Sequence, residues 1–268
     1  MNKLEAIQKM LGAKTRCLAH DVAILQIPNE VKEAIRLCKS GFDFSLEGMP
    51  QALDWEKLKS AEAQSSEEIF TGADGKRYPC WLPGDESLGD DWLLSHQYYP
   101  YYFRLYHQLG KEMINPSLLE FGVRSGYSGV VFSKAVPGAK TYVGVDPNLY
   151  VAQGLESAAA TYRQLQKEGN LLQYFLIEGF SSSEAVQKTL SFSAPFDFIH
   201  VDGEHTLQGK ILDLRIARNL VSENGYVLVD DFEHHGFIFD SVKVACKLGW
   251  FSKFSFVPTK RGLGVLKV

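Results

Sequence analysis

The chain has 268 residues, 45% of them hydrophobic, and a formal net charge of −4 at pH 7. This length suits one large domain with a modest extension, and the slightly acidic balance does not indicate a nucleic-acid partner. No apolar run approaches the roughly 20 residues of a transmembrane helix, and charges interrupt the N-terminal stretch where a signal peptide would be apolar. We therefore expect no membrane partner. The scattered cysteines form no CxxC pair, so we expect free thiols in a cytoplasmic protein. They are Cys17, Cys38, Cys80 and Cys246.

The N-terminal third of the chain differs in texture from the rest. Apolar residues recur at helical spacing up to about residue 65, for example at Val31 and Ile35. Residues 65–94 are rich in Gly, Pro and Asp, which is typical of a loop or small irregular cap. We predict that residues 1–94 form a helical extension with a loop-rich cap or lid, followed by a domain at residues 95–268. The extension is a candidate acceptor lid or a subunit contact in a homo-oligomer.

Residues 95–110 are rich in aromatic side chains. Tyr99, Phe103 and Tyr106 recur at helical spacing and are predicted to pack against the sheet that follows. The other tyrosines lie close to Pro100, where a helix interior is disfavoured. Their polar tips suit the lining of a cofactor or acceptor pocket. These tyrosines are Tyr98, Tyr101 and Tyr102.

From about Ser95 onward, short apolar runs alternate with segments able to form helices. Runs rich in Val, Ile, Leu, Phe and Tyr indicate strands, and their alternation with helices indicates βαβ units. We predict a Rossmann-like, doubly wound α/β domain with a mostly parallel seven-stranded sheet, ending in an antiparallel hairpin at residues 251–268. The other strand-like runs are residues 117–123, 141–146, 171–179, 196–202 and 225–231. Helical segments include residues 129–136, 155–169 and 210–225.

Ligands of open α/β sheets bind beyond the carboxyl ends of the strands, where the stretch "LLEFGVRSGYSG" places an acid and three glycines. Gly122 can turn the chain out of the strand, and the later glycines let a helix begin close to a ligand. Glu120 would repel a pyrophosphate, so we interpret it as a partner for a cationic group of an amino-acid cofactor. The alternative is a structural strand-to-helix turn with a solvated Glu120.

Asp146 ends the next strand-like run, "TYVGVD", and lies 24 positions after Gly122 (146 − 122). That offset is close to the one at which an acid grips ribose hydroxyls, and a carboxylate can accept from both vicinal hydroxyls. The alternative is a turn-forming acid before Pro147. Two acids at successive strand ends fit a nucleoside with a cationic tail, which is the shape of S-adenosylmethionine.

The stretches "LLEFGVRSGYSG", "VGVDPN", "FDFIHVDGEH" and "GYVLVDD" together resemble the class I S-adenosylmethionine-dependent methyltransferases. They are most similar to the metal-dependent O-methyltransferase branch, with catechol, macrolide-sugar and cephalosporin-pathway members. The resemblance covers roughly residues 95–268, and the glycine loop departs from the commoner ExGxGxG form. It implies that Glu120, Gly122 and Ser128 lie along the methionine portion of the cofactor and that Asp146 holds the ribose.

The same resemblance places adenine beside the stretch "EGFSSS", residues 178–183. Phe180 and Ser181 are the contacts that we expect there. The alternative is that these serines only cap the start of a helix.

Three acids follow the next two strand-like runs, Asp202 after the first and Asp230 and Asp231 after the second. Carboxylates gathered at neighbouring strand ends repel unless a cation or protons intervene. Oxygen ligands suit Mg²⁺, Mn²⁺ or Ca²⁺, and the resemblance implies that these three positions hold a divalent metal, with Mg²⁺ the first candidate. The alternatives are that one acid of the pair caps a helix, or that Lys210 and Arg215 supply hidden counter-charges.

His205 lies three residues after Asp202 and could accept a proton from a substrate hydroxyl as general base. A histidine at this position has that role in the macrolide-sugar branch, so Asp202 and His205 are the predicted catalytic residues. The alternative is a loop histidine bonded to backbone. His200 lies within an apolar run and is interpreted as a core histidine. His234 and His235 could touch substrate or metal, but such pairs are more often loop surface.

The leading hypothesis is methyl transfer from S-adenosylmethionine to a hydroxyl oxygen of a small molecule, assisted by a divalent metal. A nicotinamide-dependent oxidoreductase is the first alternative, and the glycine spacing and Glu120 argue against it. A non-catalytic binding protein with the same fold is the second, and the three acids with His205 argue against it. N-methylation stays open.

Overall fold

The computed structural model describes residues 27–54, 68–71, 77–80, 99–124, 126–136, 138–149, 173–232, 235–257 and 261–268. Among the described helices, none is long and apolar enough to cross a lipid bilayer. The predicted helix at residues 155–169, together with Tyr98, His234 and residues 1–26, lies outside the described residues.

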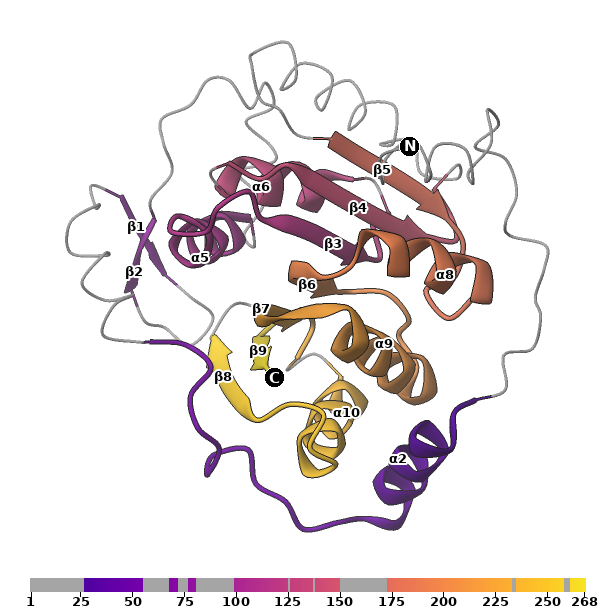
Figure 1. Ribbon diagram of the computed structural model, residues 1–268. Coiled ribbons are helices and arrows are strands. Elements are labelled where there is room, and N and C mark those ends of the chain that lie inside the picture. Colours follow the sequence, from indigo (N-terminus) through magenta and orange to yellow (C-terminus); the bar gives the residue numbers. More distant parts are fainter. Residues whose placement is uncertain are drawn as a thin grey trace.

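A seven-stranded sheet forms the centre of the molecule (Figure 1). Its strands are β3 (Ser117–Phe121), β4 (Thr141–Asp146), β5 (Gln173–Glu178), β6 (Phe196–Val201), β7 (Val221–Val229), β8 (Lys253–Val257) and β9 (Leu263–Lys267). The order across the sheet is β5-β4-β3-β6-β7-β9-β8, parallel from β5 to β7. β9 runs antiparallel to β7 and to β8. The predicted mostly parallel sheet with a terminal hairpin is confirmed.

Helices cover both faces of this sheet (Figure 1). The helices α5 (Tyr99–Gly110) and α6 (Tyr127–Ala135) pack over one face, in the cluster around Phe132 and Tyr142. The helices α8 (Glu184–Ser193), α9 (Leu207–Leu220) and α10 (Gly236–Lys247) pack over the other, in the cluster around Ile199. Because both faces are covered, the central strands read as nearly continuous apolar runs, which is why the sequence pattern located them.

The boundary between α9 and β7 differs from the prediction. Residues 221–225 were expected to continue the helix, but β7 begins at Val221, immediately after Leu220. Val221 pairs with Phe196, and the register then shifts before Phe198. Asn224 and Gly225 are poor helix formers, and pairing with β6 stabilises the extended backbone instead.

The aromatic helix α5 begins at Tyr99, in agreement with the helical spacing of Tyr99, Phe103 and Tyr106. Pro100 lies in its first turn, where the missing N–H of a proline breaks no helical hydrogen bond. The backbone of Tyr101 and Tyr102 is helical, and Pro100 lies at the helix start rather than in the helix interior that the prediction disfavoured. Phe103 and Tyr106 are buried in the core, as predicted.

The described part of the N-terminal extension packs directly on the domain. The helix α2 (Asn29–Ser40) buries Val31 and Ala34 against α9 and α10. The following segment runs beside β8, where Ala52 N donates to Phe254 O over 3.3 Å and Phe254 N donates to Pro50 O over 2.9 Å. Within the segment expected as a loop or small irregular cap, β1 (Glu68–Thr71) and β2 (Arg77–Cys80) pair as a small antiparallel sheet.

Candidate active site

The carboxyl ends of β3, β4, β6 and β7 place the predicted site residues along one edge of the sheet. Hydrogen bonding between strands continues just past the strand ends, because Gly122 N donates to Val145 O over 2.9 Å and Asp202 N donates to Phe121 O over 2.9 Å. Asp230 N donates to the carbonyl that ends β6 over 3.2 Å. The turns that follow the strands are therefore held in register with one another.

Gly122 joins the glycine turn to the acid at the end of β6. Its φ is +91°, which L side chains rarely adopt, and a Cβ there would lie 2.1 Å from the backbone oxygen of Asp202. Both constraints require glycine at this position. The close approach brings the turn after β3 against the loop that carries Asp202 and His205.

Glu120 lies beneath the glycine turn and is only 1% exposed, so the alternative of a solvated acid is wrong. Its carboxylate accepts hydrogen bonds from Ser128 Oγ and from Tyr142 Oη. Burial raises the pKa of Glu120 to about 7, while these two hydrogen bonds act in the opposite direction. The structure thus brings Glu120 and Ser128 together, and their place along a cofactor stays a prediction.

Asp146 is buried at the end of β4 and ties two turns together. Its Oδ2 accepts from Arg124 N over 2.7 Å, and its Oδ1 accepts from Asn148 N over 2.6 Å. The alternative that Asp146 stabilises a turn through its carboxylate is therefore confirmed. Each oxygen retains a second lone pair, so binding of ribose hydroxyls is compatible with these contacts and stays a prediction.

The acid pair after β7 is buried and held by several donors. Tyr102 Oη donates to Asp230 Oδ2 over 2.5 Å, and Asp231 N donates to Asp230 Oδ1 over 2.8 Å. Burial raises the pKa of Asp230. Burial acts in the same direction on Asp231, but hydrogen bonds from His205 at 3.2 Å and Arg261 at 2.9 Å outweigh it and lower the pKa of that acid.

Asp202 differs from the other two acids because one of its carboxylate oxygens lacks a hydrogen bond. Its Oδ1 atom is buried and makes no hydrogen bond with the described residues, and His205 Nε2 lies 3.5 Å from it. Burial, followed by the charge of Asp230, raises the pKa of Asp202 well above its usual value, although Lys210 opposes the shift. The Asp202 side chain is 29% exposed, but a buried carboxylate oxygen without a hydrogen bond favours a proton or a cation beside it.

The ligand atoms at this edge fall into two overlapping groups, each within 4.8 Å. One group contains His200, Asp202 and Asp230, and the other contains Asp202, His205 and Asp231. The predicted three acids are thus gathered, but they are divided between two groups that share Asp202. Carboxylate oxygens around an unpartnered buried oxygen fit a hard divalent cation.

The histidines of this region occupy different environments. His205 projects outward, with 43% of its side chain exposed, and its Nε2 faces both Asp202 and Asp231. The buried His200 pairs through Nδ1 with Tyr106 Oη at 3.0 Å, as expected for a core histidine. Burial lowers the pKa of His200 to about 3, so this ring stays neutral. The ring of His235 meets that of His205 edge to face at 5.9 Å.

Phe180 and Ser181, the expected adenine contacts, line a cleft of about 510 Å³ together with residues of α9 and the loop before it. Phe180 is 48% exposed, and Ser181 Oγ donates to Asp213 Oδ1. Ser183 caps α8 by accepting from Val186 N over 3.2 Å, so the capping alternative holds for that serine. Adenine binding in the cleft stays a prediction.

Sequence reasoning missed several partners of these acids. Arg261 was not considered, although β9 runs antiparallel to β7 and so begins beside the end that carries Asp231. Lys210 was weighed as a counter-charge and is fully buried near Asp202. Arg215 does not act as a counter-charge for these acids, because its Nε binds Glu30 at 2.5 Å. Tyr142 and Asp213 lack any local sequence signal for their roles.

Comparison with known proteins agrees with this arrangement. Residues 119–232 match a protein family described as "Methyltransferase domain", and this stretch contains the glycine turn, Asp146 and the three acids. The O-methyltransferase ankF of Aspergillus thermomutatus is 32% identical over 127 residues, which cover 46% of this chain and 48% of ankF. The chain thus matches about half the length of this curated relative.

Among solved structures, the O-methyltransferase TomG from Streptomyces achromogenes, determined in complex with S-adenosylmethionine, has a TM-score of 0.50 and 18% sequence identity. The match covers 81% of this chain and 99% of TomG. At this identity the likeness shows the fold alone. The sheet order and the TomG likeness show a Rossmann-like fold. The match to the family described as "Methyltransferase domain" lies within this fold, at residues 119–232.

Proposed function

We propose that this protein transfers a methyl group from S-adenosylmethionine to a hydroxyl oxygen of a small molecule, with the help of a divalent cation. The observation that carries the proposal is the contact between the glycine turn and the acid cluster, made through Gly122 and Asp202. A methyl donor and a metal-held acceptor must lie side by side, and this contact brings their candidate sites together. The name of ankF, an O-methyltransferase, supports the choice of oxygen as the acceptor atom.

For the cofactor, we propose that Glu120 and Ser128 lie along the methionine portion and that Asp146 accepts hydrogen bonds from the ribose. The cleft beside Phe180 and Ser181 would take the adenine. Glu120 is already bonded to Ser128 and Tyr142, so its contribution to a sulfonium or ammonium group is electrostatic. Its ionised form would be favoured by that cationic neighbour.

For the metal, we propose Asp202, Asp230 and Asp231 as the protein ligands. Their oxygen donors and the unpartnered Oδ1 of Asp202 fit Mg²⁺ or Mn²⁺. A cation bound there would polarise the acceptor oxygen and lower the pKa of its hydroxyl.

His205 would take the hydroxyl proton. With Nε2–H donated to Asp231, the neutral ring keeps Nδ1 as its proton acceptor, and Asp231 stabilises the imidazolium that forms. S-adenosylmethionine held beside Glu120, Ser128 and Asp146 would supply the methyl group to the deprotonated acceptor oxygen, and S-adenosylhomocysteine would be the second product. Because the step is an in-line displacement, orientation of the two reactants supplies much of the rate.

The experiment is a methyl-transfer assay with S-adenosylmethionine, Mg²⁺ and a panel of hydroxylated small molecules, read by mass spectrometry of the product. The expected result is a methyl ether together with S-adenosylhomocysteine. Calorimetry with S-adenosylhomocysteine and with NAD should show binding of the first only. Binding of NAD without S-adenosylhomocysteine would reject the proposal in favour of the oxidoreductase, and an N-methyl product would reject the oxygen acceptor.

A further inference from the structure

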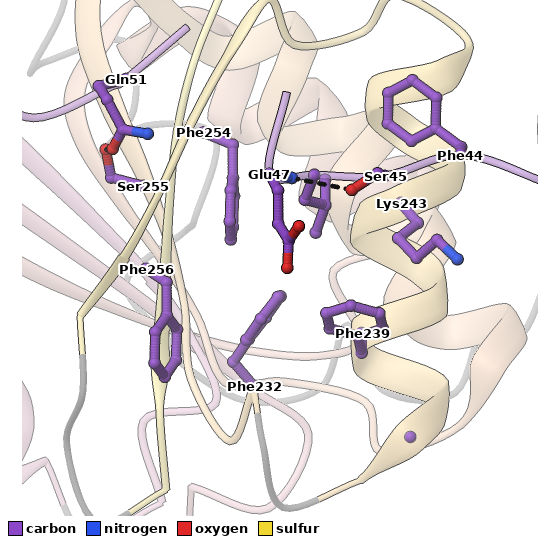
Figure 2. A pocket seen from close by; sticks show the side chains of 12 residues that line it. Phe44, Ser45, Glu47, Gln51, Phe232, Phe239, Lys243, Phe254, Ser255 and Phe256 are labelled. Carbon is purple, nitrogen blue, oxygen red and sulfur yellow. Dashed lines mark hydrogen bonds between the residues drawn. The ribbon is translucent and has the colours of Figure 1, made fainter. Parts of the chain in front are cut away.

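A second pocket, of about 860 Å³, lies between the N-terminal segment at residues 44–51, α10 and β8 (Figure 2). One of its lining residues is Phe232, which directly follows Asp231 of the acid cluster in the sequence. The pocket is thus adjacent to the candidate metal site along the chain, and part of its wall comes from the N-terminal extension.

Five phenylalanines form much of the lining, and four of them make a cluster. The ring of Phe232 lies at their centre, with its centroid 5.2 Å from that of Phe239, 5.5 Å from that of Phe254 and 5.7 Å from that of Phe256. The planes are tilted or perpendicular to one another, so the rings are not stacked into a flat sheet. Ring faces carry negative partial charge and attract cations.

One carboxylate projects among these rings. Figure 2 shows the Glu47 side chain pointing between Phe232, Phe239 and Phe254. Within the part of the chain that the structure describes, no hydrogen bond or ion pair is found for this carboxylate. The Glu47 backbone is held by Ser45, whose Oγ accepts from Glu47 N over 3.2 Å.

The cation on the pocket wall does not neutralise Glu47. Figure 2 shows the Lys243 ammonium pointing away from the Glu47 carboxylate. Its Nζ lies 5.2 Å from the ring centroid of Phe42 and 5.7 Å from that of Phe239, so it already interacts with two rings. The pocket therefore combines aromatic faces with an exposed carboxylate that has no cationic partner among the described residues.

We propose that this pocket binds an organic cation, an ammonium group carried on an apolar body, and that this molecule is the methyl acceptor. The aromatic faces and Glu47 both favour a positive charge, and the phenylalanines favour an apolar body. An anionic ligand would meet repulsion from both. The acceptor role rests on the proposed methyl transfer, since it is the position of Phe232 beside Asp231 that would bring the acceptor's hydroxyl to the acid cluster.

The test is calorimetric titration with phenethylammonium, phenethyl alcohol and phenylacetate, each with and without saturating S-adenosylhomocysteine. The ammonium should bind about tenfold more tightly than the alcohol, because both the carboxylate and the rings attract its charge. Phenylacetate should bind most weakly. Equal affinity for the ammonium and the alcohol, or preference for the anion, would overturn the proposal.

Variants locate the binding. Glu47→Gln should weaken phenethylammonium binding about fivefold and leave phenethyl alcohol unchanged, whereas Asp43→Asn, which alters an exposed acid of the same segment outside the pocket, should have no effect. Phe239→Leu should weaken phenethylammonium binding about threefold. Phe192→Leu, which changes a similarly exposed phenylalanine on α8, should leave that binding unchanged. Equal effects of Glu47→Gln and Asp43→Asn would contradict the proposal.

The two proposals can fail separately. Binding of S-adenosylhomocysteine without binding of phenethylammonium would reject the cation pocket alone. Binding of phenethylammonium without S-adenosylhomocysteine would reject methyl transfer and the acceptor role.

Discussion

At the β3–β4 end of the site, Glu120 and Asp146 are each bonded by two neutral donors, hydroxyl groups for the first and backbone amides for the second. At the β6–β7 end, His205 and Arg261 bond to Asp231, and Tyr102 and a backbone amide bond to Asp230. Asp202 Oδ1 accepts no hydrogen bond from the described residues, although Lys210 is nearby. The first end is complete as a hydrogen-bonded structure. The second is not, and a cation would complete it.

If this comparison is right, the largest effect comes from removing the cation. A chelator should reduce turnover to background, and added Mg²⁺ or Mn²⁺ should restore it. Asp202→Asn should lower turnover by at least about a hundredfold, since a metal contributes several kcal/mol to such a step, while S-adenosylhomocysteine binding survives. Glu223→Gln, which changes an exposed acid near the start of β7, should have no effect. Full activity in a chelator with a proven acceptor would reject the metal.

Removing the base should have the next largest effect. His205→Ala should lower turnover about 10²–10⁴-fold, the range for a missing general base. Binding of S-adenosylhomocysteine should persist, because the β3–β4 end does not use this side chain. Added imidazole should restore part of the rate. A variant that loses cofactor affinity and turnover together would show that His205 supports the loop rather than the chemistry.

Glu120 should make the stability of the cofactor-free protein depend on pH. Burial raises its pKa to about 7 from 4.5, so the folded state keeps a proton that the unfolded state loses. The free energy of unfolding should therefore fall as pH rises from 4.5 to about 7, by about 3 kcal/mol from this group. Glu120→Gln should remove that part of the dependence in urea denaturation at a series of pH values. An unchanged slope in the variant would show that Glu120 stays ionised throughout.

The smallest effect is expected at Asp146. Asp146→Asn keeps one acceptor oxygen but loses the negative charge, and hydrogen bonds to a charged group contribute about 1.5–3 kcal/mol. S-adenosylmethionine affinity should therefore fall about tenfold, with a small loss of stability from the weakened contacts to Arg124 and Asn148. Calorimetry that shows unchanged affinity would leave Asp146 as a turn-forming residue only.

Much of the fold and the outline of the site could be predicted because they depend on local patterns. Buried parallel strands read as apolar runs, and the ends of such strands converge, so Asp146, Asp202 and Asp230 were placed correctly at one edge. The predicted boundary between α9 and β7 was wrong because no residue at Val221 signals the end of the helix. The strand begins there because Val221 pairs with Phe196.

The partners of the acids could not be predicted in the same way. Arg261 lies 30 positions from Asp231 and reaches it only because β9 inserts between β7 and β8. Tyr142 reaches Glu120 because β4 lies beside β3, and Tyr102 reaches Asp230 from a helix on one face of the sheet. Each contact depends on the order of the strands in the sheet and on helix packing, and neither can be predicted from the local sequence of one strand.

The central claim is that a divalent cation binds the three acids. The most direct test is a calorimetric titration of the protein with Mn²⁺, without acceptor and without measurement of turnover. The account predicts one site in the wild type, strong loss of binding in Asp202→Asn and no loss in Glu223→Gln. Arg261→Gln should tighten the site, because the cation no longer competes with a guanidinium for Asp231. Absence of saturable Mn²⁺ binding, or equal binding by Asp202→Asn and the wild type, would contradict the claim that a cation completes the acid cluster.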